Sequence, residues 1–188
     1  MMRNEKTMNL ETGPVIAAIR DSESLKKALA SGVELIFDLT PNVLTLKDKV
    51  TEVHKVNKKI FIHLDLADGI GKDRAGIEFC KLAGVDGIIS TRSNLIKLAS
   101  EASLLTVQRF FIIDSHSVGI TVDTLKTSRA DMIEVMPGVV PKVIESLKQN
   151  IKQPIIAGGL IDKKSEIIDA IKSGASAIST GVCEFWEE

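Results

Sequence analysis

The sequence has few of the residues that would mark it for several classes of protein. It contains two cysteines, one tryptophan and no tyrosine among its 188 residues. The cysteines, Cys80 and Cys183, lie far apart, which fits neither a disulfide framework nor a metal-ligand spacing. A reducing cytoplasm is therefore the simplest setting. The scarcity of aromatic side chains also leaves little surface on which nucleic-acid bases would stack.

Long apolar runs and a strong net charge are absent as well. No apolar run approaches the roughly 20 residues that a membrane-spanning helix needs, so no membrane partner is expected. The 24 basic and 25 acidic residues give a net charge of −1, which creates no strong field for nucleic acid or anionic lipid. The polar residues 1–12 lack a signal-peptide core. We expect them to form a flexible N-terminal tail before one domain over residues 13–188.

Apolar runs alternate with segments whose apolar residues recur at helical spacing. This rhythm predicts parallel strands joined by helices. The expected strands cover residues 15–19, 35–39, 60–65, 87–90, 107–114, 132–136, 155–158 and 177–180. Eight strand units without a reversal signal favour a compact single-domain (β/α)8 barrel of the TIM type. An open doubly wound sheet remains the alternative, because the sequence does not show closure.

Two segments near the end of the sequence resemble each other. Residues 154–159 read Pro-Ile-Ile-Ala-Gly-Gly, and residues 174–181 read Gly-Ala-Ser-Ala-Ile-Ser-Thr-Gly. Each is typical of a buried strand that ends in glycine or a small hydroxyl residue. In a (β/α)8 barrel, the loops after the last two strands hold phosphate with backbone N–H groups. We therefore predict a phosphate site at Gly158, Gly159, Thr180 and Gly181; tight turns or close helix packing would also explain the glycines.

The other strand ends are rich in polar side chains. Binding residues of a parallel barrel lie where its strands end. Period-two alternation places Glu134 on one face with Met132, and Asp114 on one face with Ile112. If these faces line the interior, carboxylates and arginines converge on one mouth. The ligand-binding candidates are Arg20, Asp38, His63, Asp65, Arg92, Asp114 and Glu134; for each one singly, a helix cap or ion pair is an equal alternative.

The sequence predicts no particular catalytic chemistry. It has no compact metal-binding spacing, no Gly-x-Ser-x-Gly elbow, and no lysine at an expected strand end for a Schiff base. We therefore assign no catalytic residue and no metal site. An acid–base enzyme acting on a small phosphorylated polyol or sugar remains open as an alternative, such as an isomerase, epimerase or phosphodiesterase. It would use Asp65, Asp114 or Glu134.

Several segments together carry a resemblance to a known family. They are PVIAAIR at 14–20, HLDL at 63–66, DGIISTR at 86–92, QRFFIIDS at 108–115, MPG at 136–138 and PIIAGGLI at 154–161. Gly174, Ser179, Thr180 and a terminal Trp186 complete the pattern. With these segments the chain resembles the glycerol uptake operon antiterminator regulatory proteins, which respond to glycerol 3-phosphate.

The resemblance implies a regulator rather than an enzyme. Such a protein senses glycerol 3-phosphate, binds the leader mRNA of glycerol-utilisation genes and promotes read-through of a terminator. It implies a cytoplasmic location, no cofactor, and a phosphate bound at Gly158, Gly159, Thr180 and Gly181. From the barrel geometry we expect the glycerol hydroxyls to meet Asp65, Asp114 or Glu134. A homo-oligomer is left open.

Overall fold

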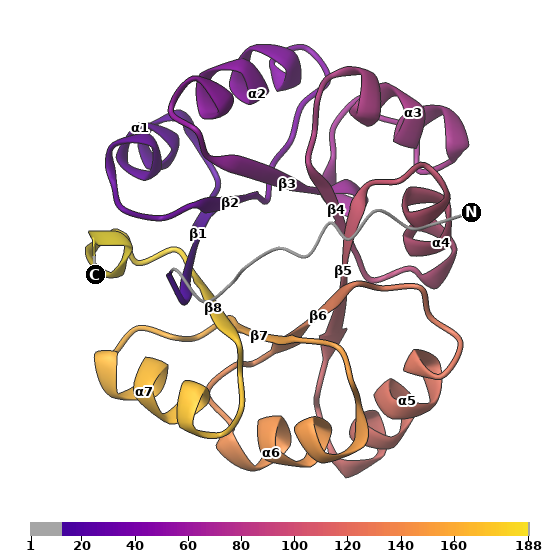
Figure 1. Ribbon diagram of the computed structural model, residues 1–188, viewed down its shortest axis with the longest axis vertical. Helices are drawn as coiled ribbons and strands as arrows, with labels where there is room; N and C mark the ends of the chain where they lie inside the picture. Colours follow the sequence, from indigo (N-terminus) through magenta and orange to yellow (C-terminus); the bar gives the residue numbers. More distant parts are fainter. Residues whose placement is uncertain (1–12, 188) are drawn as a thin grey trace.

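Short segments rich in valine and isoleucine form the strands of a closed parallel barrel (Figure 1). The computed structural model describes residues 13–187, so the flexible tail expected over 1–12 lies outside the described residues. Each strand pairs with the next in the sequence, and β1 pairs with β8 to close the ring. The barrel prediction is confirmed, and the open sheet is wrong. The strands are β1 (Val15–Ile19), β2 (Leu35–Asp38), β3 (Lys59–His63), β4 (Gly87–Ser90), β5 (Leu105–Phe111), β6 (Met132–Met136), β7 (Ile155–Gly158) and β8 (Ala177–Thr180).

Helices surround the barrel and cover its outer face (Figure 1). Asp21 begins the first helix by accepting a hydrogen bond from the Ser24 backbone N–H, and Pro141 occupies the first turn of α6. None of the described helices is both long enough and apolar enough to cross a membrane. The helices are α1 (Ser22–Ala30), α2 (Leu46–Lys55), α3 (Arg74–Leu82), α4 (Ser93–Glu101), α5 (Ser115–Leu125), α6 (Pro141–Asn150) and α7 (Lys164–Lys172), with 3-10 turns η1 (Leu64–Leu66) and η2 (Cys183–Glu187).

Alternate strand residues fill the barrel interior below its carboxyl end. The Phe37 and Phe61 rings stack there with their centroids 5.8 Å apart. Gly87 leaves room for them, because a Cβ at this position would lie 2.7 Å from the Phe61 ring. The interior is therefore packed rather than hollow. Its buried residues are Ile16, Leu35, Phe37, Leu39, Phe61, Ile89, Leu105, Val107, Met132, Ile156 and Ala177.

The C-terminal turn η2 forms hydrogen bonds both to the end of β8 and to the residues that follow the first helix. Trp186 is 1% exposed, and its indole Nε1 donates to the carbonyl oxygen of Thr180 at 3.0 Å. Its own carbonyl accepts a hydrogen bond from the backbone N–H of Gly32 at 3.2 Å. In Figure 1 this segment, drawn in yellow, lies beside α1. The loop after β8 is thus held from outside the barrel.

Two strands end at least two residues earlier than expected. The fifth strand ends at Phe111 rather than at 114, because the Asp114 side chain accepts a hydrogen bond from the Ser117 backbone N–H and starts α5 at Ser115. The third strand ends at His63 rather than at 65, because the next residues form η1. Both differences change which side chains face the barrel mouth.

Candidate functional site

A cavity of about 300 Å³ lies at the carboxyl ends of the strands. Its walls come from the ends of β1, β2, β5, β6, β7 and β8 and from the loops that follow them. The lining residues are Ala18, Arg20, Leu39, Arg109, Glu134, Met136, Gly159, Leu160, Ile161, Asp162, Ser179, Thr180, Gly181 and Val182. The loops after β7 and β8 therefore meet at one cavity, as the paired glycine segments indicated.

A buried network forms the floor of this cavity. Glu134 on β6 is fully buried, and its Oε2 accepts a hydrogen bond from Nε of Arg109 at 2.6 Å. Its Oε1 accepts one from the Ser179 hydroxyl at 2.5 Å. Both carboxylate oxygens thus accept hydrogen bonds, and the carboxylate is paired with an arginine whose side chain is only 6% exposed. Such a pair is stable while complete and costly to break.

Arg109 and Ser179 are site residues that the sequence analysis missed. On β5, the inward face carries Val107 and therefore also Arg109, two residues later. On β8, the buried Ala177 and Ser179 share the inward face in the same way. The alternation carries this signal, but a fifth strand extended to residue 114 places Asp114, and not Arg109, at the strand end.

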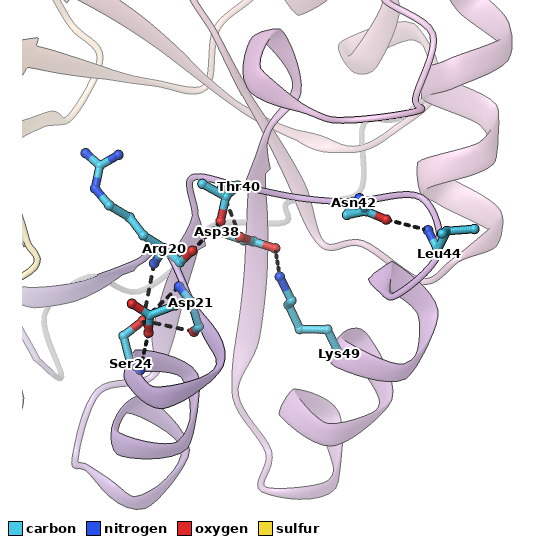
Figure 2. A network of polar contacts seen from close by, with 8 residues as sticks. All are labelled: Arg20, Asp21, Ser24, Asp38, Thr40, Asn42, Leu44 and Lys49. Carbon is cyan, nitrogen blue, oxygen red and sulfur yellow. Dashed lines mark hydrogen bonds and ion pairs between the residues drawn. The ribbon is translucent and has the colours of Figure 1, made fainter.

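Two arginines present cationic groups to the cavity. Arg20 lies at the end of β1, where its carbonyl oxygen accepts a hydrogen bond from the Thr40 hydroxyl at 2.6 Å. Figure 2 shows its guanidinium extending away from Asp21 and Asp38. Within residues 13–187, neither this guanidinium nor the terminal nitrogens of Arg109 have a hydrogen-bond partner. Two guanidinium groups at one cavity suit an anion such as phosphate.

The four residues of the predicted phosphate site have different positions. Gly159, with a φ of +75°, and Gly181 line the cavity. Gly158 packs against the buried network, since a Cβ there would lie 2.5 Å from both Oε1 of Glu134 and Oγ of Ser179. The Thr180 hydroxyl donates to the Ile161 carbonyl at 3.0 Å and accepts from the Val182 N–H. It therefore joins the loops after β7 and β8.

Asp38 and Asp114 lie apart from this group, contrary to the expected convergence. Residues 37 and 39 take the inward face of β2, so Asp38 faces α2 and pairs with Lys49 Nζ at 2.5 Å (Figure 2). Asp114 is an exposed N-cap of α5. For these two candidates, the structure assigns the ion-pair and helix-cap roles that were the alternatives.

Asp65 links the end of β3 to the end of β4. Its carboxylate accepts hydrogen bonds from the Ser90 hydroxyl at 2.7 Å and from the Thr91 backbone N–H at 2.7 Å. Nε of Arg92 lies 3.8 Å away. Burial alone would raise the pKa of Asp65, but these hydrogen bonds outweigh it and hold the pKa below its usual value. Asp65 and Arg92 therefore stabilise the adjoining loops and do not line the cavity.

His63 is buried at the end of β3 and is 3% exposed. Burial, followed by the charge of Arg109, lowers its pKa from 6.5 to about 4; Arg20 adds to this effect, and Asp65 opposes it. The imidazole is thus neutral near pH 7. Among the described residues, its Nδ1 has no hydrogen-bond partner.

We expect the free energy of unfolding to fall as the pH is lowered from about 6.5 towards 4. An unfolded histidine titrates near 6.5, whereas folded His63 stays neutral down to about 4, so the unfolded chain binds more protons in this interval. A full proton of difference costs about 1.4 kcal/mol per pH unit. Urea denaturation across this interval would measure the slope. His63→Gln should have a shallower pH dependence, and equal slopes would contradict the assignment.

Residues 13–187 contain no group of three or more His, Cys, Asp or Glu side chains placed to hold a metal ion. The cavity instead combines two cationic groups, glycine loops and a carboxylate that is already paired. This arrangement is suited to binding a small anion.

Comparison with known proteins identifies the family. The sequence profile of the glycerol-3-phosphate responsive antiterminators matches residues 15–186. The uncharacterized protein YgcP of Escherichia coli is 36% identical over 178 residues, which cover 94% of this chain and 93% of that protein.

Solved structures give the same result. A glycerol uptake operon antiterminator regulatory protein from Listeria monocytogenes is 32% identical, with a TM-score of 0.87 over 93% of this chain and 95% of that chain. An antiterminator-related protein from Thermotoga maritima is 31% identical, with a TM-score of 0.82 over 92% and 96%. A deoxyribose phosphate aldolase from Aeropyrum pernix, at 14% identity and a TM-score of 0.72 over 94% and 88%, shares the fold alone. The chain belongs to the family of glycerol-3-phosphate responsive antiterminators.

Proposed function

We propose that this protein binds glycerol 3-phosphate in the cavity and, in the bound form, acts on the leader mRNA of glycerol-utilisation genes to promote read-through. The family supplies the effector and the kind of regulation. The observation that carries the binding site is the cavity at the barrel mouth, where two guanidinium groups stand beside two glycine loops. A cytoplasmic location belongs to the same proposal.

The geometry suits a small phosphorylated polyol. A doubly charged phosphate between Arg20 and Arg109 would accept charge-assisted hydrogen bonds from both side chains. The backbone N–H groups of Gly159 and Gly181 would complete its coordination, as in other anion-binding loops. A volume of about 300 Å³ lies at the small end of the range for ligand pockets, which favours a ligand the size of glycerol 3-phosphate.

Regulation requires that the effector favours one conformation over another. The Thr180 hydroxyl joins the loops after β7 and β8, so a phosphate held by both loops would fix their relative position. RNA affinity should then rise with glycerol 3-phosphate, and it should fall with increasing salt because RNA contacts displace counterions. Filter binding of the leader RNA at several salt concentrations, with and without the effector, would measure both effects.

Replacing Arg20 with methionine is expected to weaken glycerol 3-phosphate binding at least about tenfold, because a charge-assisted contact to phosphate is lost. The free energy of unfolding should change by less than about 0.5 kcal/mol, since the guanidinium has no partner among the described residues. Calorimetric titration with glycerol 3-phosphate, glycerol and inorganic phosphate would measure the affinities.

The matched control is Arg92→Met, which also removes an exposed arginine at a strand end. Arg92 does not line the cavity, so its loss should leave the affinity within about twofold. Equal affinities for wild type and Arg20→Met would move the phosphate elsewhere. Turnover of glycerol 3-phosphate in the presence of Mg²⁺ or Zn²⁺ would favour the enzyme alternative instead.

A further inference from the structure

Nearly all polar side chains at the carboxyl end of the barrel form hydrogen bonds with other groups of the protein. Both oxygens of Glu134 accept hydrogen bonds from side chains, and both oxygens of Asp65 accept hydrogen bonds from the end of β4. The Thr180 hydroxyl is bonded in the loops after β7 and β8. Across residues 13–187, the buried side-chain polar atom that is left without a partner is Nδ1 of His63.

His63 belongs to the inner face of the barrel. Phe61 on the same strand packs in the interior, and His63 follows two residues later on the same face. Arg20 and Arg109, which both line the cavity, are near enough to act on its charge. The imidazole therefore points into the barrel interior from the β3 side, next to the cavity-lining face but outside the set of residues that line the cavity.

The closed ring places His63 across from the predicted phosphate loop. With eight strands in sequence order, β3 and β7 lie four positions apart, on opposite sides of the barrel. Gly159 follows β7, and Gly181 follows the adjacent β8. A ligand whose phosphate lies at these glycines would extend its other end towards His63.

The unpaired Nδ1 of His63 indicates which chemical group the ligand carries at the end opposite its phosphate. A buried polar atom without a partner costs about 1–3 kcal/mol, and such an atom in a folded protein calls for a bound partner. A hydroxyl group both donates and accepts, so it satisfies the ring nitrogen in either tautomer. A phosphate dianion only accepts hydrogen bonds, and the two arginines attract it more strongly.

We infer that His63 determines specificity for the polyol part of the effector: its Nδ1 hydrogen-bonds a hydroxyl group of a short polyol phosphate whose phosphate lies at the loops after β7 and β8. The inference rests on the proposed function and adds a second recognition point to it. Because Nδ1 is closed off from solvent, the inference requires the imidazole ring to turn towards the cavity when the hydroxyl binds. The binding site then has an anion end and a hydroxyl end.

The test compares glycerol 3-phosphate with n-propyl phosphate, which has the same chain and phosphate but no hydroxyl groups. Wild type should bind glycerol 3-phosphate at least about tenfold more tightly, because a site built for a hydroxyl is left unpaired by the analogue. His63→Phe should reduce this ratio to about threefold or less and leave n-propyl phosphate binding within about twofold. His63→Gln, which retains hydrogen-bonding groups, should restore part of the ratio.

The binding results distinguish a failure of the role assigned to His63 from a failure of the proposed function. An unchanged ratio in His63→Phe, or an equal loss of affinity for both ligands, would overturn the role of His63 alone. If wild type binds neither ligand, the proposed function fails and the inference fails with it.

A second measurement avoids dependence on the variants. In wild-type protein with ¹⁵N-labelled histidine, glycerol 3-phosphate should shift the His63 ring nitrogens and n-propyl phosphate should not. Ring signals that do not respond to glycerol 3-phosphate, or that respond equally to both ligands, would overturn the inference.

Discussion

Replacing Gly158 with alanine is expected to abolish glycerol 3-phosphate binding and to lower the free energy of unfolding by about 3 kcal/mol. The new Cβ would lie 2.5 Å from Oε1 of Glu134 and 2.5 Å from Oγ of Ser179. The two side chains would have to separate, which breaks a buried hydrogen bond and disturbs the cavity floor. Urea denaturation and the ligand-induced shift in melting temperature would measure the two effects.

Gly119→Ala provides the matched control. Gly119 lies within α5, and a Cβ there would have no neighbouring atom within 4 Å. The same substitution at this position should leave binding intact and raise stability by up to about 1 kcal/mol, because alanine favours the helix. If Gly158→Ala retained the wild-type thermal shift, the phosphate would have to bind away from this network.

Replacing Arg109 with leucine is expected to lower the free energy of unfolding by about 3–5 kcal/mol. The substitution leaves the carboxylate of Glu134 fully buried with the Ser179 hydroxyl as its remaining partner among the described side chains. A buried charge without its counter-charge is far more costly than the loss of a surface ion pair. Glycerol 3-phosphate binding should be lost as well, because a cation is removed from the cavity.

Two further variants test whether the loss of stability comes from the stranded Glu134 carboxylate or simply from removing an arginine. Arg129→Leu removes a half-exposed arginine that lies 3.6 Å from Glu101, and it should cost about 1 kcal/mol or less. The double variant Arg109→Leu with Glu134→Leu should be more stable than Arg109→Leu alone, since the stranded charge is gone. If the double variant were less stable than Arg109→Leu, the burial argument would be wrong.

The architecture could be predicted from the sequence because the same strong local pattern recurs along the chain. Eight apolar runs ending in polar residues are separated by segments with helical spacing, and the structure closes these strands into one barrel. The errors in strand boundaries occur where a local cap or a 3-10 turn ends the strand early. Extension of the fifth strand beyond Phe111 was expected from its apolar residues, but Asp114 starts a helix through a side-chain hydrogen bond.

The cavity was only partly predictable. Arg20, Glu134, Gly159, Thr180 and Gly181, which the sequence analysis named as candidates, line it. Asp38 lies outside the cavity because its neighbours Phe37 and Leu39 fill the barrel interior, and residue type alone does not show which face of a strand a side chain takes. Which charged groups neutralise one another inside a barrel depends on side-chain directions from distant strands, and a linear pattern does not record those directions.

The anchoring of the loop after β8 has a consequence for protein synthesis. The cavity needs β1 and β8 side by side, and Trp186 holds the Thr180 carbonyl from the far end of the chain. A nascent chain whose β8 is still inside the ribosome therefore lacks a closed ring, and one whose residue 186 is still inside lacks the contact that supports the loop after β8. The proposed binding of glycerol 3-phosphate would then begin only after these residues have left the ribosome and folded onto the barrel.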